Sequence, residues 1–164
     1  MILHTARLTL RRARPDDLEE VYAMMSRPAA MRYWSTPEHE TLAETKAWLA
    51  SMISAIGTTS NDFLIERDGR VIGKAGAWKL PEIGYLIHPD HWGQGFAHEA
   101  ISAVIPYLFA THAVPALTAE IEPRNAASWH LLLKLGFAET GRASRTMQWR
   151  DEWRDSVYFA LPRP

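Results

Sequence analysis

The sequence of 164 residues contains no cysteine. Its absence excludes disulfides, thiolate metal sites and any mechanism that holds an acyl group on an enzyme thiol. No apolar run approaches the roughly 18 residues of a membrane-spanning helix. Residues 1–7 show no secretion signal either. The sequence therefore predicts a cytoplasmic protein with no membrane partner.

The chain also carries little net charge, −1 at pH 7, because 18 Lys and Arg residues balance 19 Asp and Glu residues. This balance gives no general attraction to nucleic acid, so any phosphate group must be held by local geometry. The histidines include no helix-face pair with a third ligand, and we expect no metal. A hydrophobic fraction of 47% over this length predicts one domain, residues 1–164, with its own core.

The apolar pattern predicts strands that alternate with helices. Strands are predicted where apolar and polar residues alternate or where short apolar runs end at turn residues: 7–13, 63–67, 70–78, 83–87, 117–121, 143–149 and 156–161. Helices are predicted where apolar residues recur every three or four positions: 16–25, 41–56, 101–109 and 125–135. This order predicts an α/β fold with one mixed sheet and four helices.

Three local signals refine these predictions. Asp16 with Glu19, and Thr41 with Glu44, have the spacing of a capping box at a helix start. Pro106 lies inside the third predicted helix, where a proline removes a backbone hydrogen bond. We therefore expect that helix to be kinked or shortened.

A glycine-containing segment, HWGQGFAHEA at 91–100, follows the strand predicted at 83–87. A strand, a short loop with Gly93 and Gly95, and then a helix present backbone N–H groups and a positive dipole end to an anion. Glycines and the small Ala97 let the anion approach closely. The same pattern also fits a simple strand-to-helix turn. The P-loop and dinucleotide-binding motifs are both absent.

Residues 87–100 resemble the acetyl-CoA pyrophosphate loop of the GNAT N-acetyltransferases. The family pattern Gln/Arg-x-x-Gly-x-Gly/Ala falls on 92–97, with Trp92 in place of the leading polar residue, a departure common in the RimJ/RimL-type branch. Two further segments, 5–11 and 125–137, are similar to this branch, which contains ribosomal-protein N-terminal acetyltransferases. The resemblance covers nearly the whole chain.

The resemblance implies an α+β GNAT fold, in which a single mixed, mostly antiparallel sheet has splayed parallel central strands and about four helices. It also implies acetyl-CoA as co-substrate. The residues implied to bind its pantetheine arm and pyrophosphate are Tyr85, Leu86 and Ile87, through their backbone, and Gly93, Gln94, Gly95, Phe96, Ala97, His98 and Asn125. Asn125 fits equally well as the N-cap of the following helix.

The resemblance also implies catalytic residues. Glu120, five residues before Asn125, is the first candidate for the general base, and Glu82 is the second. Without the resemblance, both read as solvated surface carboxylates. The tyrosine that protonates the leaving thiolate in related enzymes is replaced by Leu132. Ser128 is the substitute acid in this branch, although it also fits as an ordinary hydroxyl in the first turn of a helix.

These features predict an N-acetyltransferase in which a primary amine attacks acetyl-CoA directly in a ternary complex. An α-amine, with a pKa of about 8, asks less of the base than a lysine side chain at about 10.4. The acceptor is therefore expected to be a protein or peptide N-terminus or a small amine. The alternatives are an amino acid, polyamine or antibiotic acceptor, a non-catalytic acyl-CoA-binding module, and a structural domain.

The seven tryptophans of the sequence exceed average usage several-fold. Large aromatic residues most often serve core packing or an interface. In the family the resemblance indicates, the segments containing Trp34, Trp78, Trp149 and Trp153 border the acceptor groove. These residues are expected either to select the acceptor or to form a contact in a homodimer.

Overall fold

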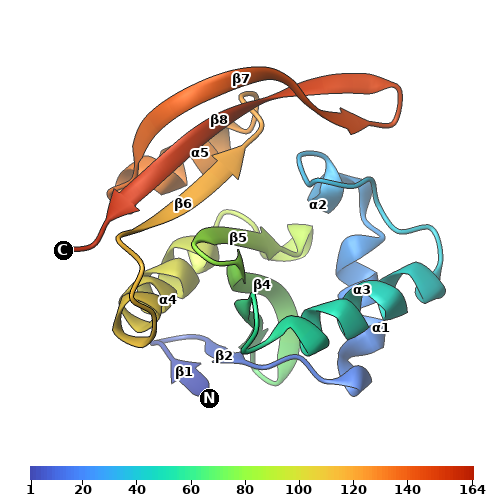
Figure 1. Ribbon diagram of the computed structural model, residues 1–164. Helices are drawn as coiled ribbons and strands as arrows, with labels where there is room; N and C mark the ends of the chain where they lie inside the picture. The colour runs from blue at the N-terminus through green and yellow to red at the C-terminus, as the bar shows by residue number, and fades with distance from the viewer.

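The sheet of the computed structural model, which describes residues 1–164, has eight strands in the order β1-β2-β3-β4-β5-β6-β8-β7 (Figure 1). The strands are β1 (Ile2–His4), β2 (Thr9–Arg11), β3 (Asn61–Arg67), β4 (Arg70–Lys79), β5 (Glu82–Ile87), β6 (Ala116–Ile121), β7 (Ala138–Trp149) and β8 (Glu152–Pro162). All neighbouring strands are antiparallel except β5 and β6, which are parallel. The expected mixed, mostly antiparallel sheet is confirmed.

The two parallel strands separate after their first contact. Each has six residues, yet β5 and β6 pair only at Glu82 and Thr118. On its other side, β6 pairs with β8 along its whole length, from Ala116 to Ile121. The edge of β5 that faces β6 therefore has free backbone groups, and the sheet has an opening at its centre. The predicted splay of the central strands is confirmed.

Five α-helices cover the sheet, one more than predicted: α1 (Leu18–Met25), α2 (Pro28–Met31), α3 (Leu42–Ala55), α4 (Phe96–Thr111) and α5 (Ala126–Lys134). The additional helix, α2, has four residues, which is too short to show a helical period. None of the helices is long and apolar enough to cross a membrane.

Two helices differ from their predicted bounds. Pro106 does not shorten α4, which continues to Thr111 because its fully buried apolar face holds the helix against the sheet. The helix-start signal at Asp16 falls one residue too early. Asp17, in a 3-10 turn before α1, accepts the hydrogen bond from the backbone N–H of Arg14, at 2.7 Å. The cap at Thr41 is present as predicted.

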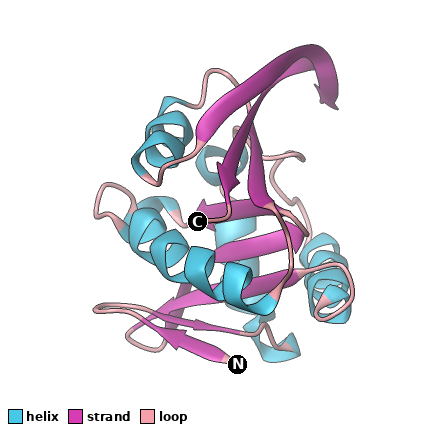
Figure 2. Cartoon of the chain, turned by 60° about the vertical axis from the view of Figure 1, so that its left-hand side comes forward, coloured by secondary structure: helices cyan, strands magenta, loops and turns pink.

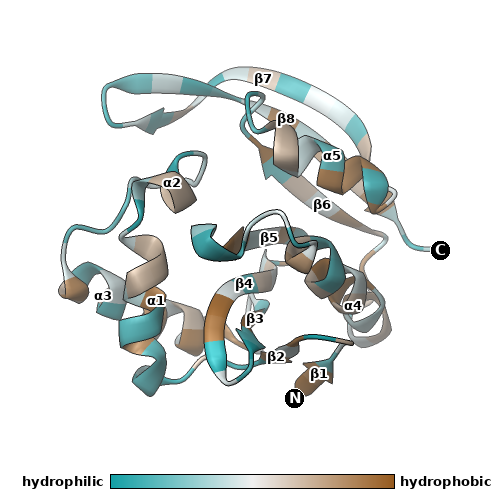
Figure 3. Cartoon of the chain, turned by 180° about the vertical axis from the view of Figure 1, so that it is seen from behind, coloured by the Kyte–Doolittle hydropathy of each residue, from teal (hydrophilic) through white to brown (hydrophobic).

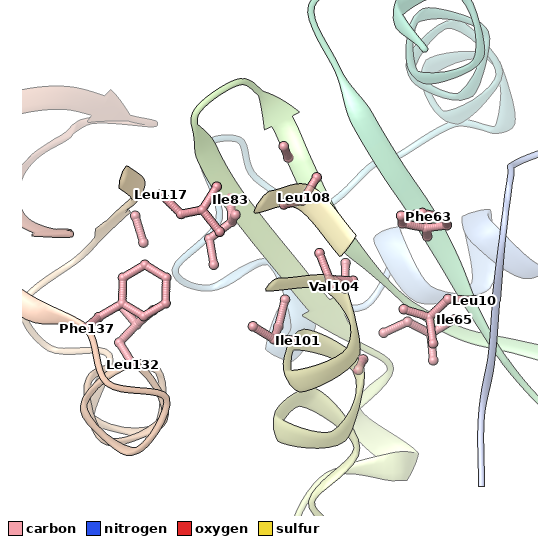
Figure 4. Close-up of a cluster of buried hydrophobic side chains, with 14 of the residues drawn as sticks. Leu10, Phe63, Ile65, Ile83, Ile101, Val104, Leu108, Leu117, Leu132 and Phe137 are labelled. Carbon is pink, nitrogen blue, oxygen red and sulfur yellow. The ribbon is translucent and has the colours of Figure 1, made fainter. Parts of the chain in front are cut away.

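Two apolar clusters fill the two faces of the sheet. One lies under α4 and α5, where Ile101, Val104 and Leu108 of α4 lie between Ile83 and Phe63 of the strands (Figure 4). The other lies under α1, α2 and α3 and contains strand residues of the opposite orientation, among them Leu64, Leu86 and Val71. Because successive side chains of a strand alternate between faces, the sheet separates the two clusters.

The β7–β8 hairpin extends beyond the rest of the sheet (Figure 2). Polar residues predominate along β7 (Figure 3). Near its turn, Arg150 forms an ion pair with Glu38 at 2.6 Å, and Arg154 donates a hydrogen bond to the carbonyl oxygen of Arg32. These contacts connect the hairpin to the segment after α2, so the hairpin lies over the face of the sheet that α3 covers.

Candidate active site

The loop between β5 and α4 has a backbone that only glycine adopts readily. Gly93 and Gly95 have φ values of +71° and +78°, and Gly95 is the N-cap of α4. A side chain in this left-handed region costs about 1–2 kcal/mol. Both glycines are exposed, as is Gln94 between them. The loop therefore leaves the first N–H groups of α4 open to an anion, with Ala97 and His98 in the first turn.

Two aromatic side chains hold this loop in place. Trp92 donates from Nε1 to the carbonyl oxygen of Ile87, at 2.8 Å. The residue that departs from the family pattern therefore fastens the loop to the end of β5. The ring of Phe96 is buried, with 2% exposure. Only the backbone N–H of this predicted ligand residue can face a phosphate.

Residues 5–7 pack against the first turn of α4. Glu99 accepts hydrogen bonds from Thr5 Oγ1 at 2.5 Å and from the backbone N and Nε of Arg7 at 2.8 and 2.7 Å. Burial acts to raise the pKa of Glu99, but these bonds lower it below its ordinary value. The guanidinium groups of Arg7 and Arg67 lie 4.5 and 4.9 Å from the ring centroid of Phe96. The sequence pattern of residues 5–11 does not predict that Arg7 and Arg67 lie beside the loop.

The remaining implied co-substrate residues border the opening between β5 and β6. Tyr85, Leu86 and Ile87 pair with β4 on one side only. Asn125 is the N-cap of α5, because its Oδ1 accepts a hydrogen bond from the N–H of Ser128 at 3.2 Å. Its amide nitrogen makes no hydrogen bond within the protein. The capping role of Asn125 therefore leaves a donor free, and these residues fit the pantetheine arm that the fold family implies.

Ser128 meets a tyrosine across the same opening. Its Oγ lies 2.5 Å from the hydroxyl oxygen of Tyr85, and Ser128 is 8% exposed. Burial raises the pKa of Tyr85 to about 12, although the hydrogen bond with Ser128 lowers it. Leu132, which stands where related enzymes have a catalytic tyrosine, is fully buried in the core. The structure thus places a different tyrosine, Tyr85, beside the predicted acid.

A cavity of about 580 Å³ lies on the opposite face of the sheet, beside α3. Its aromatic lining consists of Tyr33, Trp34, Trp48 and Trp78. Trp34 and Trp78, predicted to border the acceptor groove, both line this cavity. Trp149 and Trp153 do not, because each lies against an arginine of the β7–β8 hairpin. Trp48, which the sequence analysis did not single out, lines the cavity as well.

Both predicted carboxylates line this cavity. The pairing of Glu82 with Thr118 brings Glu82 close to Glu120, two residues further along β6. Glu120 accepts a hydrogen bond from Ser156 Oγ at 2.5 Å and is exposed to the cavity. Burial, and next the negative charge of Glu120, raise the pKa of Glu82 above its ordinary value. A carboxylate with a raised pKa is suited to accept a proton near neutral pH.

Comparison with known proteins agrees with this geometry. The family model of the acetyltransferase (GNAT) domain matches residues 7–138. The chain is 31% identical to the uncharacterized N-acetyltransferase YoaA of Bacillus subtilis (strain 168), over 99% of this chain and 97% of that one. It is 34% identical to the [ribosomal protein uS5]-alanine N-acetyltransferase of Escherichia coli (strain K12), over 54% of this chain and 46% of that one.

A solved structure shares the fold over almost its entire length. RimL, a ribosomal L7/L12 α-N-protein acetyltransferase in complex with coenzyme A, superposes with a TM-score of 0.87 at 16% identity, covering 99% of this chain and 98% of that one. The chain belongs to the GNAT family of acetyltransferases. It is an acetyl-CoA-dependent N-acetyltransferase, an enzyme and not a binding module or a structural domain.

Proposed function

We propose that the chain transfers the acetyl group to a primary amine bound in the cavity beside α3, by direct attack in a ternary complex. The observation that carries this proposal is the position of Glu82 and Glu120. Both line the cavity where β5 and β6 separate, while the glycine loop, Tyr85 and Ser128 lie on the other face. The opening between β5 and β6 connects the two faces of the sheet. Acetyl-CoA bound there would supply the electrophilic thioester.

Glu82 is the proposed general base. It is more buried than Glu120, and its raised pKa suits it to take a proton from the ammonium group of the acceptor, so that the neutral amine can attack. Glu120 contributes the negative charge that helps to raise that pKa. This assignment reverses the order that sequence reasoning gave to the two carboxylates, because burial distinguishes them and the sequence does not reveal it.

Ser128 is the proposed acid. As the new C–N bond forms and the C–S bond breaks, the departing thiolate takes a proton from Ser128, which recovers one from solvent. Tyr85 keeps its own proton at neutral pH, since its pKa is about 12, and can donate a hydrogen bond to Ser128 Oγ. The hydroxyl hydrogen of Ser128 can then be donated to the departing thiolate.

The acceptor is proposed to be an α-amine, at a peptide or protein N-terminus or in a small molecule. An α-amine has a pKa of about 8 and needs less help from a base than a lysine side chain. The similarity to an enzyme named for a ribosomal-protein alanine supports an N-terminus. The cavity of about 580 Å³ is within the usual range for small ligands and supports a free amine.

The test is the release of coenzyme A thiol over a panel of N-terminal peptides and small amines. We expect Glu82→Gln to lower kcat by about 100-fold or more while acetyl-CoA still binds by calorimetry. Glu139→Gln, a carboxylate of β7 outside the cavity, is the matched control and should keep full activity. Unchanged activity in both Glu82→Gln and Glu120→Gln would overturn the assignment of the base.

A further inference from the structure

The cavity contains a single cationic side chain, and that cation is already paired. Lys74 is the only lysine or arginine of the lining. Its Nζ lies 2.6 Å from Asp62 Oδ2, and the two side chains are 2% and 4% exposed. A buried pair of this kind is costly to separate, because each partner would be left charged and unpaired. The cavity therefore offers no free cation to an anionic group of the acceptor.

The cavity carries negative charge where the amine is proposed to react. Glu82 and Glu120 face the cavity and form no ion pair, whereas another carboxylate of the lining, Glu122, is held by Arg124 at 2.7 Å. The cation whose charge acts on Glu82, Lys79, lies outside the lining. An acceptor with a carboxylate next to its amine, such as a free amino acid, would place that carboxylate beside Glu82 and Glu120. Like charges at such short range are repulsive, the more so in a partly buried site.

The cavity also has an aromatic wall, and the carboxylate beside it is already paired with a cation. Trp34 and Trp48 form its walls, and the ammonium group of Lys74 lies 5.4 Å from the ring centroid of Trp34. The carboxylate nearby, Asp62, is occupied by Lys74. A polyamine or an aminoglycoside would bring an additional ammonium group to a region that already holds one. An apolar body would instead bury its surface against the indole rings.

We infer that the acceptor is a primary amine with an apolar, preferably aromatic, body and with neither a carboxylate beside the amine nor a second cationic group. This inference rests on the proposed function of the cavity. The same chemistry comes from two sources. A free monoamine satisfies it, and so does a peptide with an apolar first residue, whose α-carboxyl group is an uncharged amide.

The test compares acceptors that share one ring and one amine. Phenethylamine has no carboxyl group, phenylalaninamide has an uncharged amide, and phenylalanine has a carboxylate. Spermidine is included as a polycation without a ring. With the wild-type enzyme at saturating acetyl-CoA, we expect kcat/KM for the first two to exceed that for phenylalanine and spermidine at least tenfold. A tetrapeptide amide with N-terminal phenylalanine, compared with phenethylamine, shows which source the enzyme prefers.

A pair of tryptophan variants tests the role of the wall. Trp48→Leu should lower kcat/KM for phenethylamine several-fold and leave acetyl-CoA binding unchanged, whereas Trp153→Leu, on the hairpin outside the cavity, should change neither. Preference for phenylalanine or spermidine overturns the acceptor class and leaves the proposed function intact. Thiol release with no member of the panel, while acetyl-CoA binds, overturns the proposed function and the acceptor class together.

Discussion

The hydroxyl oxygens of Tyr85 and Ser128 lie 2.5 Å apart and join strand β5 to the first turn of α5. Their hydrogen bond crosses the opening between β5 and β6, where no backbone pairing holds the two halves of the sheet together. Ser128 is buried and Tyr85 is partly buried. In the proposed mechanism, the pair takes the place of the tyrosine that the family resemblance implies at the position of Leu132.

Tyr85→Phe removes only the hydroxyl group, so the effect of that group on Ser128 can be measured. We expect kcat to fall about tenfold, because a hydrogen bond of this kind contributes about 1 kcal/mol or slightly more. KM for acetyl-CoA should change little. In a Ser128→Ala background the same substitution should have no effect, which a double-mutant cycle detects.

Tyr22→Phe, on α1 and outside the site, is the control for this cycle. An equal loss of kcat in both backgrounds would show that Tyr85 does not act through Ser128. An unchanged activity of Ser128→Ala alone would instead remove Ser128 as the acid.

The pH dependence of kcat/KM should report the base. Because burial and Glu120 raise the pKa of Glu82, the acidic limb of the profile is expected above the ordinary range of a glutamate. Glu120→Gln removes a negative charge beside Glu82, which makes its ionised form easier to reach. The acidic limb of the kcat/KM profile should then move to lower pH, and the variant should remain active at higher pH. Glu139→Gln should leave the limb in place, and a limb unmoved in Glu120→Gln would contradict this electrostatic coupling.

The sequence predicted local backbone geometry better than the contacts between distant segments. Gly93, Gly95 and the start of α4 form one local segment, so their geometry follows from neighbouring residues alone. The approach of Glu82 to Glu120 depends on a single pairing of two strands with a long stretch of chain between them. Sequence patterns carry no record of that register, and so the burial that distinguishes the two carboxylates was not predictable.

Short elements and side-chain partners were missed for a related reason. Strand β1 has three residues and α2 has four, and neither is long enough to express a period. Arg7 was recognised only as part of a family-like opening. Its contact with Glu99 joins residues 92 positions apart, which no local signal reports.

Arg7→Gln should weaken acetyl-CoA binding, because it leaves Glu99 as an uncompensated negative charge in the first turn of α4. We expect calorimetry to show a dissociation constant about tenfold higher, an effect of about 1.4 kcal/mol. Arg70→Gln, at the start of β4, removes an arginine from another exposed ion pair, with Glu20, away from the loop and is the control. Equal affinities in Arg7→Gln and the wild type would show that the ion pair does not support the loop.

The fourth prediction concerns stability below neutral pH. His39 is 9% exposed, and its Nδ1 lies 2.7 Å from Thr45 Oγ1. Burial lowers the pKa of His39 below 6.5, although the charge of Glu44 acts to raise it. The unfolded chain therefore binds a proton at a higher pH than the folded protein does. The stability that neutral His39 provides is complete above about pH 6.5 and is lost as the pH falls through its lower folded-state pKa.

His39→Gln keeps a hydrogen-bonding side chain that cannot titrate. Between about pH 7.5 and about pH 5.5, the melting temperature of the wild type should therefore fall more than that of His39→Gln. Some pH dependence should persist in the variant, because burial also lowers the pKa of His88. His130→Gln, an exposed histidine of α5, should retain the wild-type slope. If the melting temperature of His39→Gln fell as steeply as that of the wild type, protonation of His39 would not be the cause of the loss of stability.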